Sequence, residues 1–181
     1  MGKMETRDEK YGGGAGEVAG GRRRVEVFPW PEGNPMASWP RIFGFWRPFW
    51  NVLVITIGRW LPSVGLKNLL YRQALGMEIG RGAAIGFMAM PDIFRPDLIS
   101  VGEGAVVGYG VTILCHEFLP GEYRLGRVEI GPRAMIGANS TLLPGVRVGE
   151  GALVSAHSLV NRDIPPRVLA GGVPARVIRH L

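Results

Sequence analysis

His116 is the residue whose type and neighbours most readily support acid–base chemistry in this chain. It stands between Cys115 and Glu117, so a thiol, an imidazole and a carboxylate follow one another in the sequence. A histidine side chain with its ordinary pKa of about 6.5 is mostly neutral at neutral pH and can accept a proton from a hydroxyl or an amine. A second hypothesis is that Cys115 is a nucleophile activated by His116.

The basic excess of the chain lies after residue 36. The 181 residues have a formal net charge of +6, whereas residues 1–36 hold six basic and six acidic residues. The part from residue 37 onward has no runs of Lys and Arg with interleaved aromatic residues, which gives little support to nucleic-acid binding. Scattered arginines would suit a phosphorylated small ligand equally well.

A six-residue repeat indicates the elements that must position these side chains. Residues 130–165 divide into hexads that each open with a branched aliphatic residue, and the pattern extends upstream. A helix repeats every 3.6 residues and a strand every 2, whereas a period of six is typical of a chain that runs a short strand, turns a corner and starts again. The sequence therefore predicts a parallel β-helix. The eleven opening residues are Ile79, Ile85, Val101, Val107, Ile113, Ile130, Ile136, Leu142, Val148, Val154 and Val160.

Three hexads per turn would place residues 18 apart above one another. This spacing requires the chain to leave the coil twice, for four residues after Met90 and for eleven after His116. The columns that it predicts are Ala83, Ala105, Ala134 and Ala152, then Ser140 over Ser158, then Val146 over Ile164. Seven hexads have glycine in second place, where we expect a tight corner with positive φ; these are Gly80, Gly86, Gly102, Gly108, Gly131, Gly137 and Gly149.

The chain before the coil divides into two segments. Residues 1–38 contain glycine-rich and proline-rich stretches without periodicity, which predicts a disordered tail. Residues 39–77 predict helices that cap the open end of the coil, where strand edges would otherwise be exposed, and the coil with its C-terminal extension occupies residues 78–181. An alternative for residues 43–61 is peripheral membrane contact, because three tryptophans lie near arginines in an apolar stretch that is too short to span a bilayer.

The number of cysteines and the N-terminal sequence indicate the cellular compartment of the protein. Cys115 is the single cysteine, so no intramolecular disulfide can form. No signal peptide is visible, because the charged start is followed by glycine rather than by an apolar stretch. Together these features predict a cytoplasmic protein.

Residues 136–179, and above all the closing pattern DIPP-x4-GGVPARVIR, resemble the hexapeptide-repeat acetyltransferases. Within that family the chain is most similar to the galactoside, maltose and nodulation O-acetyltransferase type, over about residues 78–180. The resemblance implies an all-β fold with a left-handed coil and a homotrimer with sites between subunits. It also implies acetyl-CoA as co-substrate, no metal, and transfer to a hydroxyl, or an amine, of a small acceptor such as a sugar.

The resemblance further implies roles for individual residues. His116 matches the catalytic histidine of the family, which is followed by a glutamate as Glu117 is here, and it is expected to act as general base. Glu117, Glu122 or a backbone carbonyl is expected to orient the imidazole. Direct acyl transfer in this family disfavours Cys115 as a nucleophile. The positions that match coenzyme contacts are Ala138, Ala156, Asn161, Arg162, Arg176 and Arg179.

Two other classes remain as alternatives. A zinc enzyme like the gamma-class carbonic anhydrases needs three convergent histidines, but His116 and His157 are 41 residues apart and His180 lies beyond the coil. A scaffold without activity is disfavoured by His116 beside an excursion and by the arginines of the C-terminal pattern. The acceptor is not identified, because the stretch FMAMPDIFRPD is more apolar than the acceptor segment of the sugar-acetylating members.

Overall fold

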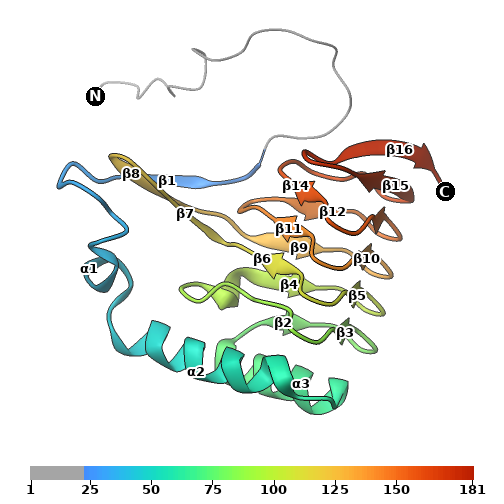
Figure 1. Ribbon diagram of the computed structural model, residues 1–181, viewed down its shortest axis with the longest axis horizontal. Helices are drawn as coiled ribbons and strands as arrows, with labels where there is room; N and C mark the ends of the chain where they lie inside the picture. The colour runs from blue at the N-terminus through green and yellow to red at the C-terminus, as the bar shows by residue number, and fades with distance from the viewer. Residues whose placement is uncertain (1–22) are drawn as a thin grey trace, which may run out of the picture.

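The computed structural model describes residues 23–181, in which the chain winds into a coil walled by three parallel sheets (Figure 1). Helices lie across one end of the coil, and an antiparallel hairpin projects from its flank (Figure 1). The first 22 residues of the tail that was predicted to be disordered lie outside the described residues.

Each sheet is built from short strands of successive turns of the coil. The first contains, in spatial order, β12 (Arg147–Val148), β9 (Val128–Ile130), β4 (Ile99–Val101) and β2 (Glu78–Ile79). The second contains β16 (Arg176–His180), β15 (Val168–Gly171), β13 (Leu153–Val154), β10 (Met135–Ile136), β5 (Val106–Val107) and β3 (Ala84–Ile85). The third contains β14 (Leu159–Val160), β11 (Thr141–Leu142) and β6 (Thr112–Ile113). Neighbouring strands are parallel except for β15 and β16, which are antiparallel.

The predicted hexad register is confirmed over most of the coil. All eleven hexad-opening residues are buried, with none more than 8% exposed. The residues that follow the alanine column pair across β3, β5, β10 and β13, so Ala83, Ala105, Ala134 and Ala152 stack, and all four are buried. Thr141 pairs with Leu159, which places Ser140 over Ser158 as expected.

The last predicted column, Val146 over Ile164, is wrong because the strand register changes in the last turn of the coil. Ile164 forms a bridge with Val148 rather than lying over Val146. The side chain of Asp163 causes the slip, since its Oδ1 accepts a hydrogen bond from the backbone N–H of Arg147 at 2.7 Å and so takes the place of a backbone carbonyl.

The predicted reason for the repeated glycines is also wrong. None of the seven second-place glycines has positive φ. Instead, a Cβ atom on any of them would lie 2.8 Å or less from the backbone of the adjacent turn, so these positions have no room for a side chain. Positive φ occurs in fourth place in nine of the eleven hexads, at Gly82, Met88, Gly104, Gly110, Arg133, Asn139, Gly145, Gly151 and His157.

Three helices and a π-helical turn precede the coil; the last three of these elements lie across its first turn, whereas the first helix lies apart from it, toward the hairpin (Figure 1). They are α1 (Trp39–Phe43), α2 (Trp46–Trp60), α3 (Val64–Leu70) and η2 (Tyr71–Leu75). Polar side chains on their inner side donate to carbonyls of that turn: Asn68 to Ala83 at 2.7 Å, Lys67 to Gly86 at 3.0 Å and Arg72 to Ile79 at 2.8 Å. The edge of the coil is therefore satisfied by side chains instead of by another strand. Within residues 23–181, no helix is long and apolar enough to cross a membrane.

The two excursions take defined structures. The first contains a short 3-10 helix, η3 (Pro96–Leu98), and the second is a hairpin of β7 (His116–Leu119) and β8 (Glu122–Leu125). The hairpin pairs in turn with β1 (Glu26–Pro29). Arg24 also donates its backbone N–H to the carbonyl of Gly145 at 2.9 Å. The prediction of a disordered tail is therefore wrong for residues 23–38, because this segment gains partners that only the folded hairpin and coil provide.

The stacking of the coil predicts the outcome of adding one methyl group. Gly137→Ala should lower the free energy of unfolding by about 1–3 kcal/mol, because its Cβ would lie 2.4 Å from the backbone nitrogen of Ala156. Gly65→Ala is the matched control, since a Cβ there meets nothing within 4 Å. Equilibrium denaturation of both variants measures the difference, and equal stability of the two would contradict the stacking argument.

Candidate active site

The first excursion and the start of β7 bring Asp92 and His116 together. The Nδ1 atom of His116 lies 2.5 Å from Oδ2 of Asp92. The Asp92 side chain is completely buried, whereas 16% of the His116 side chain is exposed. When Nδ1–H donates to this carboxylate, Nε2 is the ring nitrogen that can accept a proton.

Five donors surround the carboxylate of Asp92. Its Oδ1 accepts the backbone N–H groups of Phe94 and Arg95 at 2.8 Å each. Its Oδ2 accepts the N–H groups of Cys115 at 2.6 Å and His116 at 3.1 Å, besides the imidazole. Burial alone would raise the pKa of Asp92, but the hydrogen bond and charge of His116 and the backbone donors outweigh burial and lower that pKa. The carboxylate is therefore charged and fixed in place.

Aromatic rings hold the imidazole from its sides. The ring of Phe94 meets His116 edge-on at 4.7 Å between centroids, and Phe118 lies at 5.1 Å. Phe43 stacks on Phe94 at 4.7 Å and ties α1 to this cluster. Asn51 of α2 donates to the carbonyl of Ile93 at 2.9 Å, which fixes the excursion that carries Asp92.

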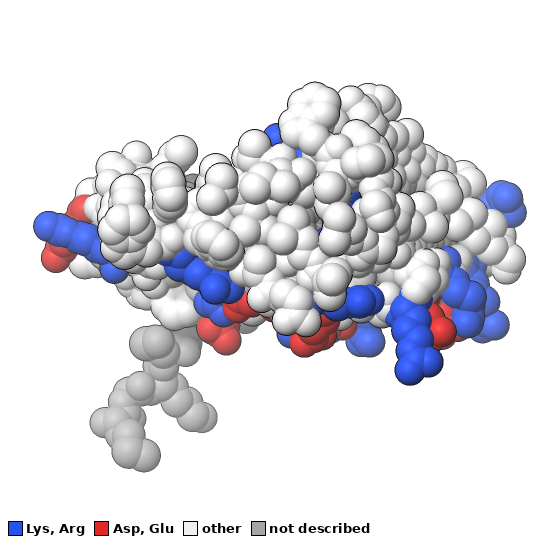
Figure 2. All heavy atoms as spheres, turned by 90° about the horizontal axis from the view of Figure 1, so that it is seen from below, with Lys and Arg blue, Asp and Glu red and all other residues white. Residues whose placement is uncertain are grey.

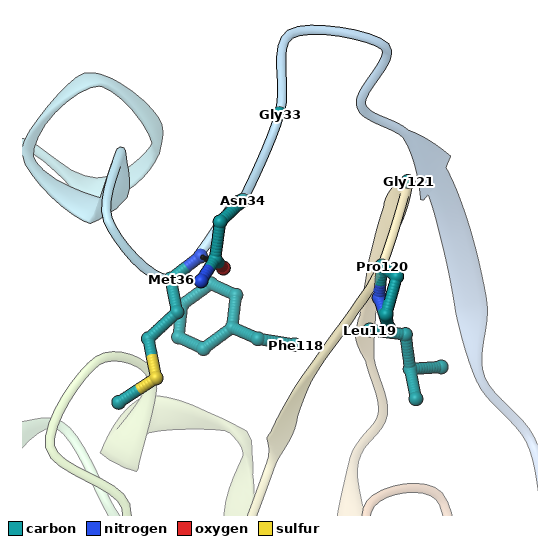
Figure 3. A pocket seen from close by; sticks show the side chains of 7 residues that line it. All are labelled: Gly33, Asn34, Met36, Phe118, Leu119, Pro120 and Gly121. Carbon is teal, nitrogen blue, oxygen red and sulfur yellow. Dashed lines mark hydrogen bonds between the residues drawn. The ribbon is translucent and has the colours of Figure 1, made fainter.

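His116 lines an open groove of about 580 Å³ between the helices and the hairpin. The other lining residues are apolar: Met36, Trp39, Phe45, Pro48, Phe49, Val52, Ile93, Phe94 and Phe118. A smaller hollow of about 370 Å³ lies at the tip of the hairpin (Figure 3). Met36 and Phe118 line both spaces and lie between them.

Glu117 and Glu122, the predicted partners of the imidazole, are engaged elsewhere. Glu117 forms an ion pair with Arg23 at 2.6 Å, and Glu122 pairs with Arg124 at 2.6 Å. The carboxylate that contacts the imidazole is instead Asp92, which lies in the stretch FMAMPDIFRPD and was not predicted as a partner of His116. A carboxylate in the first excursion, one turn before the histidine that opens the second, is the signal that could have identified it.

The thiol of Cys115 points into the core rather than toward the groove. The residue is fully buried. Burial, together with the nearby charge of Asp92, raises the pKa of the Cys115 thiol well above its usual range. A buried protonated thiol is a poor nucleophile, so the geometry disfavours the cysteine hypothesis.

The six predicted coenzyme residues lie in three places. Ala138 and Ala156 stack at the corner between the second and third sheets, where His157 donates its backbone N–H to the carbonyl of Ala138 at 2.9 Å. Asn161 and Arg162 follow β14 at the next corner, two turns of the coil from the start of the His116 hairpin. The third sheet separates these two corners, so the folded chain does not bring all of the predicted residues together.

Asn161 and Arg162 carry buried polar atoms that lack a partner. Among residues 23–181, Oδ1 of Asn161 and Nε of Arg162 form no hydrogen bond. An unpaired buried polar atom is costly, and such atoms commonly mark a place where a ligand or another chain binds. Both residues thus fit a polar ligand.

A β-bulge places Arg176 and Arg179 on the same face of β16. Arg176 pairs with Gly171 and Arg179 with Leu169, and the register shifts between these pairs. Side chains three apart on a regular strand would point to opposite faces, but the extra residue of the bulge restores them to one face. Neither guanidinium has an acidic partner among residues 23–181. Within the described residues each guanidinium donates one hydrogen bond, to a neighbouring backbone carbonyl, so both cations keep donors that suit a phosphorylated ligand.

The other histidines lie away from His116. His157 has positive φ at the corner beside Ala156, and His180 is exposed on β16. In the part of the chain that the structure describes, no group of three or more His, Cys, Asp or Glu residues could hold a metal ion.

Known proteins identify the family. The model of the family described as "Bacterial transferase hexapeptide (six repeats)" matches residues 127–162. The Bacillus subtilis (strain 168) protein named "Putative acetyltransferase YvoF" is 51% identical over 128 residues, which cover 71% of this chain and 74% of that protein. The chain therefore belongs to the hexapeptide-repeat acetyltransferases, as the sequence resemblance predicted.

Solved structures share the fold at lower identity. A maltose O-acetyltransferase from Clostridium difficile 630 superimposes with a TM-score of 0.59 at 20% identity, over 75% of this chain and 86% of that one. A galactoside acetyltransferase in complex with coenzyme A gives a TM-score of 0.56 at 23% identity, over 74% and 80%. This likeness concerns the fold, and it implies the left-handed coil that the sequence resemblance predicted.

The lowered pKa of Asp92 predicts an acid-dependent loss of stability. Its contribution to stability is present above the ordinary carboxyl value of 3.8 and is lost as the pH falls through the lower folded value. Asp92→Asn should be less stable by about 1–3 kcal/mol at neutral pH and should lose less stability on acidification below about pH 4.

Chemical denaturation at several pH values tests this. Asp97→Asn is the control, because it breaks only the half-exposed pair with Arg95, which is worth about 0–1 kcal/mol. An acid dependence that is the same in Asp92→Asn and in the native protein would contradict the assignment.

Proposed function

We propose that this protein transfers an acetyl group from acetyl-CoA to a hydroxyl group, or an amine, of an acceptor, with His116 as general base. The observation that carries the proposal is the contact between His116 Nδ1 and the buried carboxylate of Asp92, at the wall of an open groove. Membership of the acetyltransferase family and the coenzyme A complex of a structural neighbour support acetyl-CoA as the co-substrate.

The proposed step is a direct transfer of the acetyl group, in which His116 first accepts a proton from the acceptor and then donates that proton to the leaving thiolate. Its Nε2 accepts the proton of the acceptor hydroxyl while the oxygen forms a bond to the thioester carbonyl carbon. The C–S bond then breaks, and the imidazolium returns the proton to the sulfur of the departing coenzyme. Asp92 holds the imidazole in the required tautomer and stabilises the transient positive charge, while Phe94 and Phe118 limit ring rotation.

The proposed coenzyme site extends along the coil from the small residues Ala138 and Ala156 to Arg176 and Arg179. Small side chains allow the pantetheine arm to approach the backbone, and the two arginines on one face of β16 would bind the phosphates. The different corners that these residues occupy in one subunit support a homotrimer in which neighbouring subunits complete each site.

Loss of the base should abolish turnover without unfolding the protein. His116→Ala should reduce acetyl transfer, or the slow hydrolysis of acetyl-CoA, by about 10²–10⁴-fold, measured as thiol release. Circular dichroism and coenzyme affinity should remain native, because the ring is not part of the aliphatic core. His180→Ala is the control with an exposed imidazole, and it should retain activity. Native turnover by His116→Ala would remove the catalytic assignment.

Coenzyme affinity should depend on the two arginines of β16. Arg176→Ala combined with Arg179→Ala should weaken coenzyme A binding by about tenfold or more in calorimetry, and added salt should weaken native binding. Arg127→Ala combined with Arg147→Ala removes the same charge at surface pairs with Glu78 and Glu129 and serves as the control. Equal affinities in the two double variants would exclude a phosphate site at β16.

A further inference from the structure

The outer side of α2 and α3 is an apolar surface, which we call the helix face. Among its residues are three tryptophans and several aliphatic side chains that the fold leaves exposed: Phe45, Trp46, Phe49, Trp50, Val52, Leu53, Ile57, Trp60, Val64, Leu66 and Leu69. Seen from this side, the surface has a broad region without charged side chains, which instead gather along its edges (Figure 2). Contiguous exposed apolar surface of this kind marks a place of contact with a partner or a membrane.

The charge of this part of the chain narrows the choice of partner. Between Glu32 and Glu78 the sequence has no Asp or Glu and five Lys or Arg residues. Three of these five are engaged within the fold: Lys67 and Arg72 bind carbonyls of the coil, and Arg41 pairs with Glu32. On α2 itself the charged residues are Arg47, which is exposed, and Arg59, which is half-buried. Exposed tryptophans and aliphatic residues on helices whose only charged residues are basic are typical of elements that lie in the interface of an anionic membrane.

The helix face is continuous with the groove at His116. Phe45, Phe49 and Val52 are exposed on α2 and also line the groove. Apart from His116 and the indole N–H of Trp39, the lining offers no polar group to a substrate. A small polar acceptor would lose most of its hydrogen bonds to water there without replacement, whereas an alkyl chain would gain from burial.

We propose that the acceptor is an amphiphile of an anionic lipid membrane. The helix face rests on the membrane surface, the alkyl part of the acceptor lies in the groove, and its polar head presents the hydroxyl or amine to His116. This inference rests on the proposed function of His116 and assigns a substrate class to the same site.

Vesicle binding tests the membrane contact. The native protein should co-sediment with vesicles of phosphatidylcholine and phosphatidylglycerol and bind more weakly to phosphatidylcholine alone. Leu53→Glu should reduce binding by at least about tenfold, because it removes apolar contact and adds a negative charge. Val27→Glu is the matched control, since Val27 is 48% exposed and Leu53 is 45% exposed, and Val27 lies on β1, far from α2 in Figure 1. Equal binding of the two variants, or no binding by the native protein, would overturn the membrane contact.

Groove occupancy is tested separately with an alkyl chain that cannot react. Dodecylphosphocholine, kept below the concentration at which it forms micelles, should shift the imidazole NMR signals of His116. Val52→Trp should weaken this binding by about tenfold or more, because the larger side chain fills the groove while the helix face stays apolar. Leu53→Glu should retain the shift, because Leu53 does not line the groove. Unchanged His116 signals in the native protein would exclude an alkyl chain from the groove.

Two further measurements distinguish a failure of the amphiphile proposal from a failure of the acetyltransferase proposal and from self-association of the chain. If acetyl-CoA hydrolysis depends on His116 but neither vesicles nor dodecylphosphocholine bind, the amphiphile is excluded and the acetyltransferase proposal stands. If both bind but no thiol is released, the proposed function fails instead. Sedimentation velocity detects a third outcome: a change of oligomeric state in Leu53→Glu would show that a second copy of the chain covers the helix face, which overturns the membrane assignment.

Discussion

The close stacking of successive backbone turns is the constraint on which this structure depends. Parallel strands about 4.8 Å apart leave no room for a Cβ atom at positions such as Gly137, and they align side chains such as Ala134 and Ala152 into buried columns. Because every turn is held by the turns beside it, the coil is a rigid support. The two segments that leave it start and end at fixed points, and this fixes the distance between Asp92 and His116.

The chemistry of the site follows from a carboxylate that is buried but fully hydrogen-bonded. Asp92 accepts backbone donors from its own turn and from the start of β7, so the same group closes the first excursion and aligns the second. Its remaining interaction is with the imidazole. The aromatic residues around His116 exclude water on one side, and the groove opens on the other. The outcome is an imidazole at the wall of an apolar groove, with Nδ1 on Asp92 and with no hydrogen bond to its other ring nitrogen among residues 23–181.

The sequence predicts the structural features that recur in successive turns of the coil, but not the features that occur only once in the chain. The opening aliphatic residues and the alanine column follow from a period of six, because each position is tested by several turns. The slip of Ile164 could not be predicted, since it depends on the side chain of Asp163 replacing a carbonyl. The strand at Glu26–Pro29 requires the edge of a hairpin formed about 95 residues later. Asp92 was missed as the partner of His116 because 24 residues separate them and Glu117 is adjacent.

The central claim is that Asp92 fixes the tautomer of His116 so that Nε2 is the base. Nitrogen-15 NMR of the imidazole in the neutral state measures this directly. We expect Nδ1 to have the shift of a protonated nitrogen and Nε2 that of an unprotonated one, and we expect Asp92→Asn to mix the two tautomers. A proton found on Nε2 in the native protein would contradict the account, because the nitrogen that faces the groove would then be a donor.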